Sequence, residues 1–433
     1  MKNLAVVLAV FGLGLLVPQS ARCKELADFK VLYVGSERAP AYLDFLKDKV
    51  AKAEAKTRDE FTPSDADGFD VVLLDWPQTG DFGRRKPASP LGARDQWNKP
   101  TVLLGSAGLK LAMAWDLKGG SGCTCLDPLA YDLREHEIFS RPLNIDRGKM
   151  ISIPTPDSFQ GEISTDEIKV LALVDDRGRH WQAGWCTHAR QFDVNPDIEF
   201  FCGGVNHQTP TSAALWRQGN LLHFGFEQSP AEMNEHGRSL LLNSIAYISR
   251  FTQDRPIAVT PSVFTGPAAA ARSTVLRWAR PAGIEAIKHV VTPETLEKLV
   301  ALSDDGGPKG KNVLDWFDKN ARYLRPGSDQ LLELDEDLVA LDVTFDQPEF
   351  FTRAISALRS EDDAAKNRGR RLLERYVPDV PKGSDADRYA TWWRENQPYC
   401  FASDAGDYRW YVDPLARKRQ IPSSELRGPK RAD

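Results

Sequence analysis

The sequence has few residues of the types that build metal sites and disulfide frameworks. It contains six cysteines and seven histidines in 433 residues, a density far below that of a disulfide-stapled scaffold. The cysteines do not form the paired Cys-x-x-Cys pattern of structural zinc sites. Basic residues are not in excess either, since the net charge is -5. Nucleic acids and anionic membranes select basic surfaces, so neither is expected as a partner.

Long apolar runs are scarce, and the one near the N-terminus predicts export. It covers residues 4–17, which is shorter than the roughly 20 residues of a membrane-spanning helix. Lys2 precedes the run and small residues follow it, the layout of a secretory signal peptide over residues 1–23. We therefore expect a periplasmic or extracellular protein with no stable membrane span after cleavage near Cys23. An uncleaved anchor and lipid attachment at Cys23 are the alternatives, and the bulky Arg22 disfavours the second.

Export would place the remaining cysteines in an oxidising compartment, where disulfides form. Five cysteines follow Cys23, so at least one stays unpaired. Together with His188 and His207 they could instead hold a soft metal, but their spacing favours disulfides or buried thiols. We predict no metal and no cofactor, and the pairing stays open. The five are Cys123, Cys125, Cys186, Cys202 and Cys400.

The composition indicates a folded chain of two domains. Hydrophobic residues make up 42% and charged residues 27%, and a single core rarely grows beyond about 250–300 residues. The pattern changes after residue 252, where prolines and an alanine run indicate a linker. Helical periodicity with charged outer faces follows it. We predict an α/β domain over residues 28–252, a linker over 253–272 and a mainly α-helical domain over 273–433.

The first domain has the pattern of a flavodoxin-like, doubly wound, mostly parallel sheet. Short continuous apolar runs at residues 29–36, 70–76 and 101–105 are typical of parallel strands covered on both faces. An amphipathic helix is predicted over residues 39–56. In such sheets ligands bind beyond the carboxyl ends of the strands. This points to residues 35–38, 75–77, 105–108 and 225–228.

The segment 216–251 is the clearest single unit, a buried strand at 220–227 followed by an amphipathic helix. Because side chains alternate along a strand, His223, Gly225 and Glu227 share one face. Further strands are predicted at 168–175, 198–202 and 213–217. The loops between them carry Asn206 and His207, and loops on a rigid scaffold often hold binding residues.

Three motifs carry a resemblance to a known family. They are KPTVLLGSAGLKLA, HEIFSRPL and GNLLHFGFEQSP, and in this order they resemble the class I glutamine amidotransferase-like superfamily, within it the ThuA-like (trehalose-utilisation) branch. The similarity covers about residues 28–252. The later segment with TWWREN resembles a helical tail joined to such domains in exported planctomycete-type proteins, and it implies no activity.

The resemblance implies roles for three positions. The superfamily's nucleophilic cysteine corresponds to Ser106, its histidine to Gly225 and its glutamate to Glu227. A serine hydroxyl needs an adjacent general base, which a glycine cannot supply, so glutamine hydrolysis is not expected. His223 could stand in as the base, but two residues along a strand move a side chain by about 6–7 Å. A packed, hydrogen-bonded His223 and a helix-capping Ser106 are the alternatives.

Two functional hypotheses follow. In the first, an exported ThuA-like protein binds and transforms a carbohydrate, with Ser106, Glu227 and His223 as catalytic residues and the side chains of Asp75, Asn206 and His207 as binding groups. In the second, the domain is catalytically silent and serves recognition or assembly at the cell envelope, with a protein partner on the C-terminal helices. Asp75 could also be a solvated strand-end carboxylate, and Glu227 could fix a turn.

Overall fold

The computed structural model describes residues 24–77, 87–117, 122–159, 163–176, 184–188, 197–207, 209–210, 212–257, 275, 284–303, 311–327, 331–403 and 408–427. The signal segment predicted at 1–23 and most of the linker predicted at 253–272 lie outside these residues, so those boundaries stay predictions. Within the described ranges, no helix has the length and apolar character to cross a membrane.

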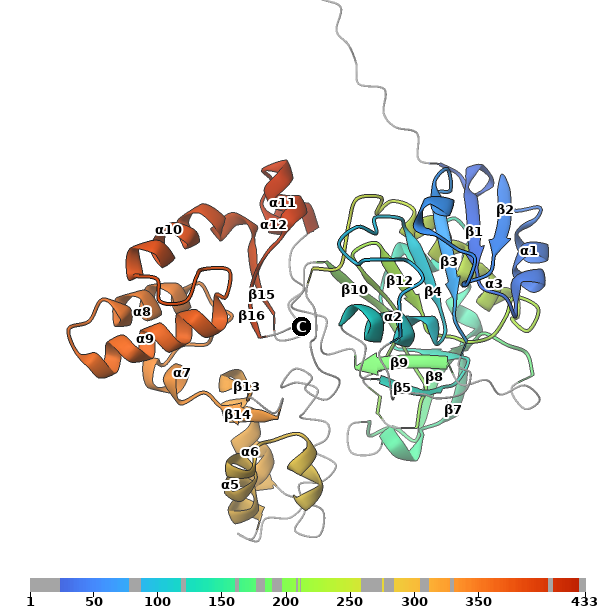
Figure 1. Cartoon of the computed structure of the whole chain (residues 1–433). Helices are drawn as coiled ribbons and strands as arrows, with labels where there is room; N and C mark the ends of the chain where they lie inside the picture. Colours follow the sequence, from blue (N-terminus) through green and yellow to red (C-terminus); the bar gives the residue numbers. More distant parts are fainter. Residues whose placement is uncertain are drawn as a thin grey trace, which may run out of the picture.

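The N-terminal part is built on one mixed sheet of 12 strands, with helices on its faces (Figure 1). The strands follow the order β2-β1-β3-β4-β12-β11-β10-β6-β8-β7, with β5 and β9 off this path. The section from β2 to β12 is parallel, which confirms the α/β class expected from the apolar runs. Its strands are β1 (Lys30–Val34), β2 (Lys52–Lys56), β3 (Val71–Asp75), β4 (Thr101–Leu104) and β12 (Leu221–Phe224).

Helices cover both faces of the parallel section, so that β1, β3, β4 and β12 are almost entirely buried. Side chains at alternate positions of β1 and β3 pack with α1 (Ala39–Leu46) and α3 (Glu235–Ile248) in one cluster. The intervening side chains pack with α2 (Ala107–Trp115) in another. These two apolar layers hold the strand ends rigidly, and those ends carry the polar residues described below.

The helix predicted over residues 39–56 is wrong in its second half. Helix α1 ends at Leu46, and residues 52–56 form the edge strand β2 instead. The sequence Lys-Ala-Glu-Ala-Lys alternates, its side chains are mostly exposed, and it pairs in parallel with β1. Charged lysines on an edge strand discourage pairing with another chain. Periodicity could not separate this strand from a helix because it lacks a buried face.

Antiparallel strands extend the sheet beyond β12. The strands predicted at 168–175, 198–202 and 213–217 are present, while β5, β6, β7 and β9 were not predicted. The extension comprises β11 (Ser212–Gln218), β10 (Ile198–Gly204), β6 (Leu129–Tyr131), β8 (Glu167–Ala172) and β7 (Ile151–Pro154), with β5 (Gly122–Leu126) paired to β9 (Gly184–His188). Strand β9 also reaches the end of β12, where the Trp185 amide donates to the Gly225 carbonyl at 2.7 Å.

The C-terminal part is mainly helical, as predicted, and has its own core. Its described residues also form two hairpins, β13 with β14 and β15 with β16. Its elements are α5 (Pro293–Ser303), α6 (Lys311–Asn320), β13 (Leu324–Pro326), β14 (Leu332–Leu334), α7 (Glu336–Leu341), α8 (Glu349–Leu358), α9 (Asp363–Tyr376), α10 (Ala386–Asn396), β15 (Cys400–Ser403), β16 (Arg409–Val412), α11 (Pro414–Arg419) and α12 (Ser423–Arg427).

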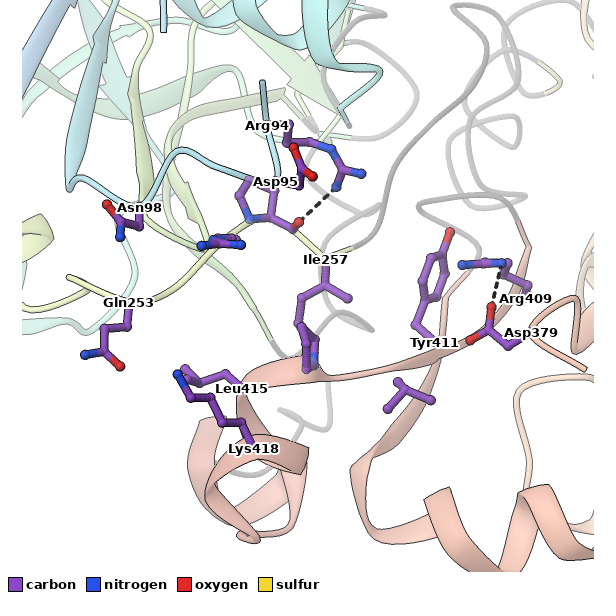
Figure 2. Close-up of a pocket in the computed structure, with 14 residues that line it drawn as sticks. Arg94, Asp95, Asn98, Gln253, Ile257, Asp379, Arg409, Tyr411, Leu415 and Lys418 are labelled. Atoms are coloured by element: carbon purple, nitrogen blue, oxygen red, sulfur yellow. Dashed lines mark hydrogen bonds and ion pairs between the residues drawn. The ribbon is translucent and has the colours of Figure 1, made fainter. Parts of the chain in front are cut away.

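The second hairpin meets the end of the N-terminal part. Tyr411 of β16 stacks on Phe401 of β15 with ring centroids 5.5 Å apart, and Ile257 packs against this pair. Figure 2 shows Ile257 and Tyr411 on facing sides of the same hollow. The segment that leaves the sheet domain is therefore held against the helical domain.

Candidate functional site

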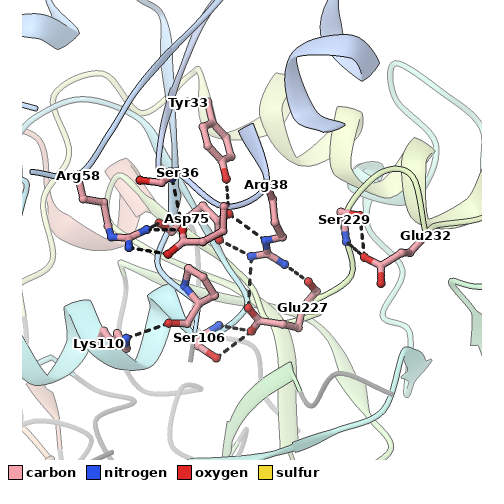
Figure 3. Close-up of polar contacts among 12 residues, drawn as sticks. Tyr33, Ser36, Arg38, Arg58, Asp75, Ser106, Lys110, Glu227, Ser229 and Glu232 are labelled. Carbon is pink, nitrogen blue, oxygen red and sulfur yellow. Dashed lines mark hydrogen bonds and ion pairs between the residues drawn. The ribbon is translucent and has the colours of Figure 1, made fainter. Parts of the chain in front are cut away.

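Five polar side chains from separate elements meet at the carboxyl edge of the parallel strands (Figure 3). Tyr33 comes from β1, Arg38 from the turn after β1, Asp75 from the end of β3, Ser106 from the start of α2, and Glu227 from the segment after β12. They meet because β1, β3, β4 and β12 are neighbours and run in one direction, so their carboxyl ends share an edge. We call these five residues the strand-edge cluster.

The Asp75 carboxylate is fully buried and fully engaged. Arg38 donates to it from Nε at 2.9 Å and from Nη2, and the Tyr33 hydroxyl donates to the same carboxylate. This bidentate geometry makes a strong ion pair. The alternative of a solvated strand-end carboxylate is therefore wrong, and Asp75 has no open side toward a ligand in this arrangement.

Glu227 is bonded from two directions. Its Oε2 accepts the Ser106 backbone N–H at 2.7 Å and the Ser106 hydroxyl at 2.8 Å, and its Oε1 forms an ion pair with Arg38 at 3.3 Å. The carboxylate thus lies at the N-terminus of α2, where backbone N–H groups attract anions. Gly105 permits this approach: its φ is +51°, and a Cβ there would lie 2.1 Å from Glu227 Oε2.

Burial displaces the pKa values of this edge. Desolvation raises the pKa of Glu227, although Arg38 and the hydrogen bonds from Ser106 oppose the shift. Desolvation, reinforced by Asp75, also raises the pKa of the Tyr33 hydroxyl. Burial and the nearby Arg58 lower the pKa of Lys110, whose ammonium donates to the Pro77 carbonyl at 2.9 Å. The cluster thus contains a carboxyl group with a raised pKa, Glu227, and at its margin lies an amine with a lowered pKa, Lys110.

The conformation of Ser106 does not match that of a nucleophile on a strained turn. Its φ of -62° and ψ of -15° are helical, and its hydroxyl donates to the Glu227 carboxylate rather than to a histidine. Ser106 does stand at the N-cap position of α2, but its side chain makes no capping hydrogen bond, so that alternative is wrong in its chemistry. The hydroxyl instead holds Glu227 in place.

The position expected for the superfamily's histidine has no room for a side chain. A Cβ on Gly225 would lie 2.1 Å from the Trp185 carbonyl oxygen and 2.8 Å from that of Ala214. Real Cβ atoms do not approach backbone oxygens so closely, so strand β9 excludes any residue except glycine here. Strand β9 is therefore the reason why no histidine can stand at position 225.

His223 is buried in an aromatic stack. Its ring lies on Trp216 with centroids 3.6 Å apart at an angle of 7°, and neither ring nitrogen has a hydrogen-bond partner among the described residues. Burial holds its pKa well below the ordinary value, so the ring is neutral. The hydrogen-bonded state expected for His223 is therefore not observed, although the packed state is. The ring cannot serve Ser106, whose hydroxyl is already directed at Glu227.

Asn206 and His207 are placed differently from each other. Asn206 is buried, and its amide closes a local turn by donating to the Thr209 carbonyl and the Ser212 hydroxyl, both at 2.7 Å. The His207 side chain is exposed. In the part of the chain that the structure describes, neither residue bonds to Asp75, Ser106 or Glu227. Ser106, Asp75 and Glu227 thus converge, whereas the other predicted residues do not join them.

Arg38 is the residue that sequence reasoning missed. It lies in the segment 35–38 that the strand-end rule marked, but nothing local distinguishes it from other arginines. An arginine following a strand whose neighbour ends in aspartate is the signal that could have found it. The role of Tyr33 was not predicted, because in the sequence it is one more residue of the apolar run 29–36.

Among the cysteines whose side chains the structure describes, one is in a disulfide and three are thiols. Cys125 is disulfide-bonded, whereas Cys186, Cys202 and Cys400 are thiols. Burial raises the pKa of Cys202 and raises that of Cys400 to about 12, so neither is an activated nucleophile. Within the described residues, no group of three or more His, Cys, Asp or Glu side chains is arranged to hold a metal ion.

Comparisons with known proteins give no family. No family model and no curated protein matches the chain. Among solved structures, one similar chain is a provisionally assigned GMP synthase component of Thermoplasma acidophilum, at 12% identity and a TM-score of 0.29, covering 52% of this chain and 96% of that one. Another is a provisionally assigned ThuA-like protein of Bacteroides uniformis ATCC 8492, at 11% identity and 0.30, covering 52% and 92%. At these values neither similarity bears on activity.

The raised pKa of Glu227 predicts a pH dependence of stability. Because the folded pKa lies above the unfolded one, the group stabilises the native state at low pH, and this contribution is lost as pH rises through the folded pKa. Glu227→Gln is expected to lack that loss. The measurement is the free energy of unfolding in urea from about pH 4 to about pH 8 for both proteins.

Glu37→Gln is a control of opposite sign. Hydrogen bonds from Arg58 lower the pKa of Glu37 to about 2, so Glu37 stabilises the protein at neutral pH and loses this effect as pH falls toward that value. For this variant and wild type, the urea series therefore extends down to about pH 2. If Glu227→Gln and wild type show parallel pH profiles, the raised pKa of Glu227 is wrong.

Proposed function

We propose that this chain is an exported recognition module that keeps an amidotransferase-like α/β fold without glutamine hydrolysis. The observation that carries the proposal is the closure of the strand-edge cluster by Arg38. Its guanidinium binds both Asp75 and Glu227, and Glu227 takes the two hydrogen bonds that Ser106 offers. The chain's own groups therefore occupy the place where a substrate would react. Export is supported by the signal-peptide layout of residues 1–23.

Acyl transfer requires a free hydrogen-bond donor for the substrate oxygen and a base for the nucleophile, and this site does not offer the superfamily's version of either. Catalysis of this kind needs hydrogen-bond donors directed at the charge that develops on the substrate oxygen. Here the donor at the start of α2 is already bonded to Glu227, and its carboxylate would repel a second anion. The superfamily's histidine base is also excluded, because no side chain fits at Gly225. The Glu227 carboxylate that accepts from the Ser106 hydroxyl is itself held in the ion pair with Arg38. A reacting carbonyl would have to displace a buried ion pair.

The test is a glutaminase assay on the mature protein from Lys24, with glutamate release as the readout. Wild type and Ser106→Cys are both expected to release glutamate no faster than buffer, because a thiol at this position still lacks the histidine that Gly225 excludes. Ser106→Ala serves as the matched control. Glutamate release by wild type that disappears in Ser106→Ala would overturn the proposal.

A second candidate is carbohydrate binding and transformation at the same edge. The raised pKa of Glu227 beside the lowered pKa of Lys110 favours it, since displaced pKa values gather at functional sites. Thermal-shift measurements with mono- and disaccharides test it, because a ligand that binds only the native state raises the Tm. A saturable rise that is lost in Glu227→Gln would favour this candidate over the silent module. No rise with any sugar would exclude it.

A further inference from the structure

A concave site lies where the two domains meet (Figure 2), and none of its lining residues belongs to the strand-edge cluster. Its cavity measures about 560 Å³, within the range of about 300–1,000 Å³ that is typical of small-molecule sites. One wall comes from residues 94–98 and 253–257 of the sheet domain, and the other from β16, α11 and Asp379 of the helical domain. Neither domain alone forms the cavity.

The walls of this cavity are fixed by contacts on both sides. Arg94 donates from Nη1 to the Pro256 carbonyl at 3.1 Å, which ties the two segments of the sheet domain together. On the other side, Arg409 forms an ion pair with Asp379 at 3.3 Å and lies over the Tyr411 ring at 4.5 Å. These contacts fix the positions of Arg94, Asp379 and Arg409 around the hollow.

Positive charge dominates the lining, in contrast to the net charge of -5 of the whole chain. Four cationic side chains face two carboxylates, and one of the carboxylates is already paired with Arg409. In the described ranges, Arg255 and Lys418 form no ion pair, and both are exposed to the cavity's solvent. Two unneutralised cations on opposite walls concentrate anions between them.

The remaining lining suits an organic body rather than an inorganic ion alone. Ile257 and Leu415 supply apolar contact, and Asn98 and Gln253 supply amide groups that bond hydroxyls. A cavity with a small number of polar groups on a partly apolar wall orients a ligand by both kinds of contact. The volume exceeds what a free sulfate or phosphate would fill.

We propose that this cavity binds a small organic oxyanion, a carboxylate or phosphate carried on a polyol ring, with the charged group between Arg255 and Lys418 and the ring against Ile257 and Leu415. Arginine binds such oxyanions in bidentate fashion, and lysine binds them as a point charge. The inference rests on the proposed function as a recognition module, and it supplies the ligand class. It does not use Ser106 or Glu227, so the glutaminase assay and the binding assay fail independently.

The experiment is isothermal titration calorimetry of the mature protein with glucuronate, glucose 6-phosphate and glucose as probes. At least one of the two anions is expected to bind at least about tenfold more tightly than glucose, since its charged group accepts charge-assisted hydrogen bonds that glucose cannot accept. Added sodium chloride should weaken the binding of the anion and leave the binding of glucose unchanged. The probe that binds more tightly identifies carboxylate or phosphate as the ligand class.

Charge-reversal variants complete the test. The double variant Arg255→Glu with Lys418→Glu is expected to bind the anion at least about tenfold more weakly than wild type does. Lys366→Glu with Lys382→Glu makes the same change of net charge at exposed lysines outside the cavity, and it should leave binding unchanged. If the double glutamate variant has a lower Tm than wild type, the double variant Arg255→Gln with Lys418→Gln is used in its place. Glucose binding as tight as the anions, binding of neither anion, or undiminished binding by the cavity variants would overturn the proposal.

Discussion

Replacing Arg38 by methionine is expected to lower the free energy of unfolding of the sheet domain by about 3–5 kcal/mol, the range for breaking a buried ion pair on one side. Asp75 has no exposed surface and Glu227 is 5% exposed, so both carboxylates would be left in low dielectric without their cation. Urea denaturation monitored by tryptophan fluorescence measures the change. Protonation of the carboxyls should restore part of the stability as pH falls.

Arg58 provides the matched control for this prediction. It also forms charged hydrogen bonds, to Glu37 at 3.1 Å and to the Asp75 carbonyl at 2.9 Å, but its partner Glu37 is largely exposed. Arg58→Met should therefore cost only about 1 kcal/mol or less. Combining Arg38→Met with Glu227→Gln should recover part of the loss, since one uncompensated charge is gone. Equal effects of Arg38→Met and Arg58→Met would contradict the central role of Arg38.

Introducing the superfamily's histidine at Gly225 is expected to prevent stable folding instead of creating an amidotransferase. Overpacking of side chains costs about 1–3 kcal/mol, and a contact with rigid backbone exceeds that range. Here the new Cβ would meet the Trp185 carbonyl oxygen at 2.1 Å, so strand β9 must separate from β12. Soluble yield and urea denaturation of Gly225→His and Gly225→Ala measure the effect.

A second glycine shows how specific the clash is. Gly148 is exposed, and a Cβ there would meet only the Asp146 side chain at 3.0 Å. Gly148→Ala should change the free energy of unfolding by less than about 1 kcal/mol, as surface substitutions usually do. Gly225→His combined with Ser106→Cys should show no glutaminase activity. A stable double variant with measurable glutamate release would show that the fold still accepts the superfamily's chemistry.

The two predictions concern residues that sequence reasoning treated unequally. Gly225 was recognised from the sequence as the position of a missing histidine. The order of the family's motifs along the chain is enough for this assignment, and it requires no knowledge of which residues lie next to Gly225 in space. The reason why no histidine could return was not visible there, since it lies in β9, a strand that periodicity did not predict. Arg38 was only a member of a strand-end segment, and its partner Glu227 lies 189 residues away along the chain.

The resemblance to a known family indicated the lack of a cysteine and a histidine for amidotransferase chemistry. Local sequence patterns were sufficient to predict the parallel strands β1, β3, β4 and β12, their buried faces, and the carboxyl edge as the meeting place of Asp75, Ser106 and Glu227. Those features follow from short apolar runs and from the rule that parallel strands end at one edge. Three other features emerged only in the folded chain: Arg38 closes this edge, His223 stacks on Trp216, and residues 52–56 pair as a strand. Each depends on contacts between separate segments, whose free energy outweighs local propensity and leaves no periodic pattern in the sequence.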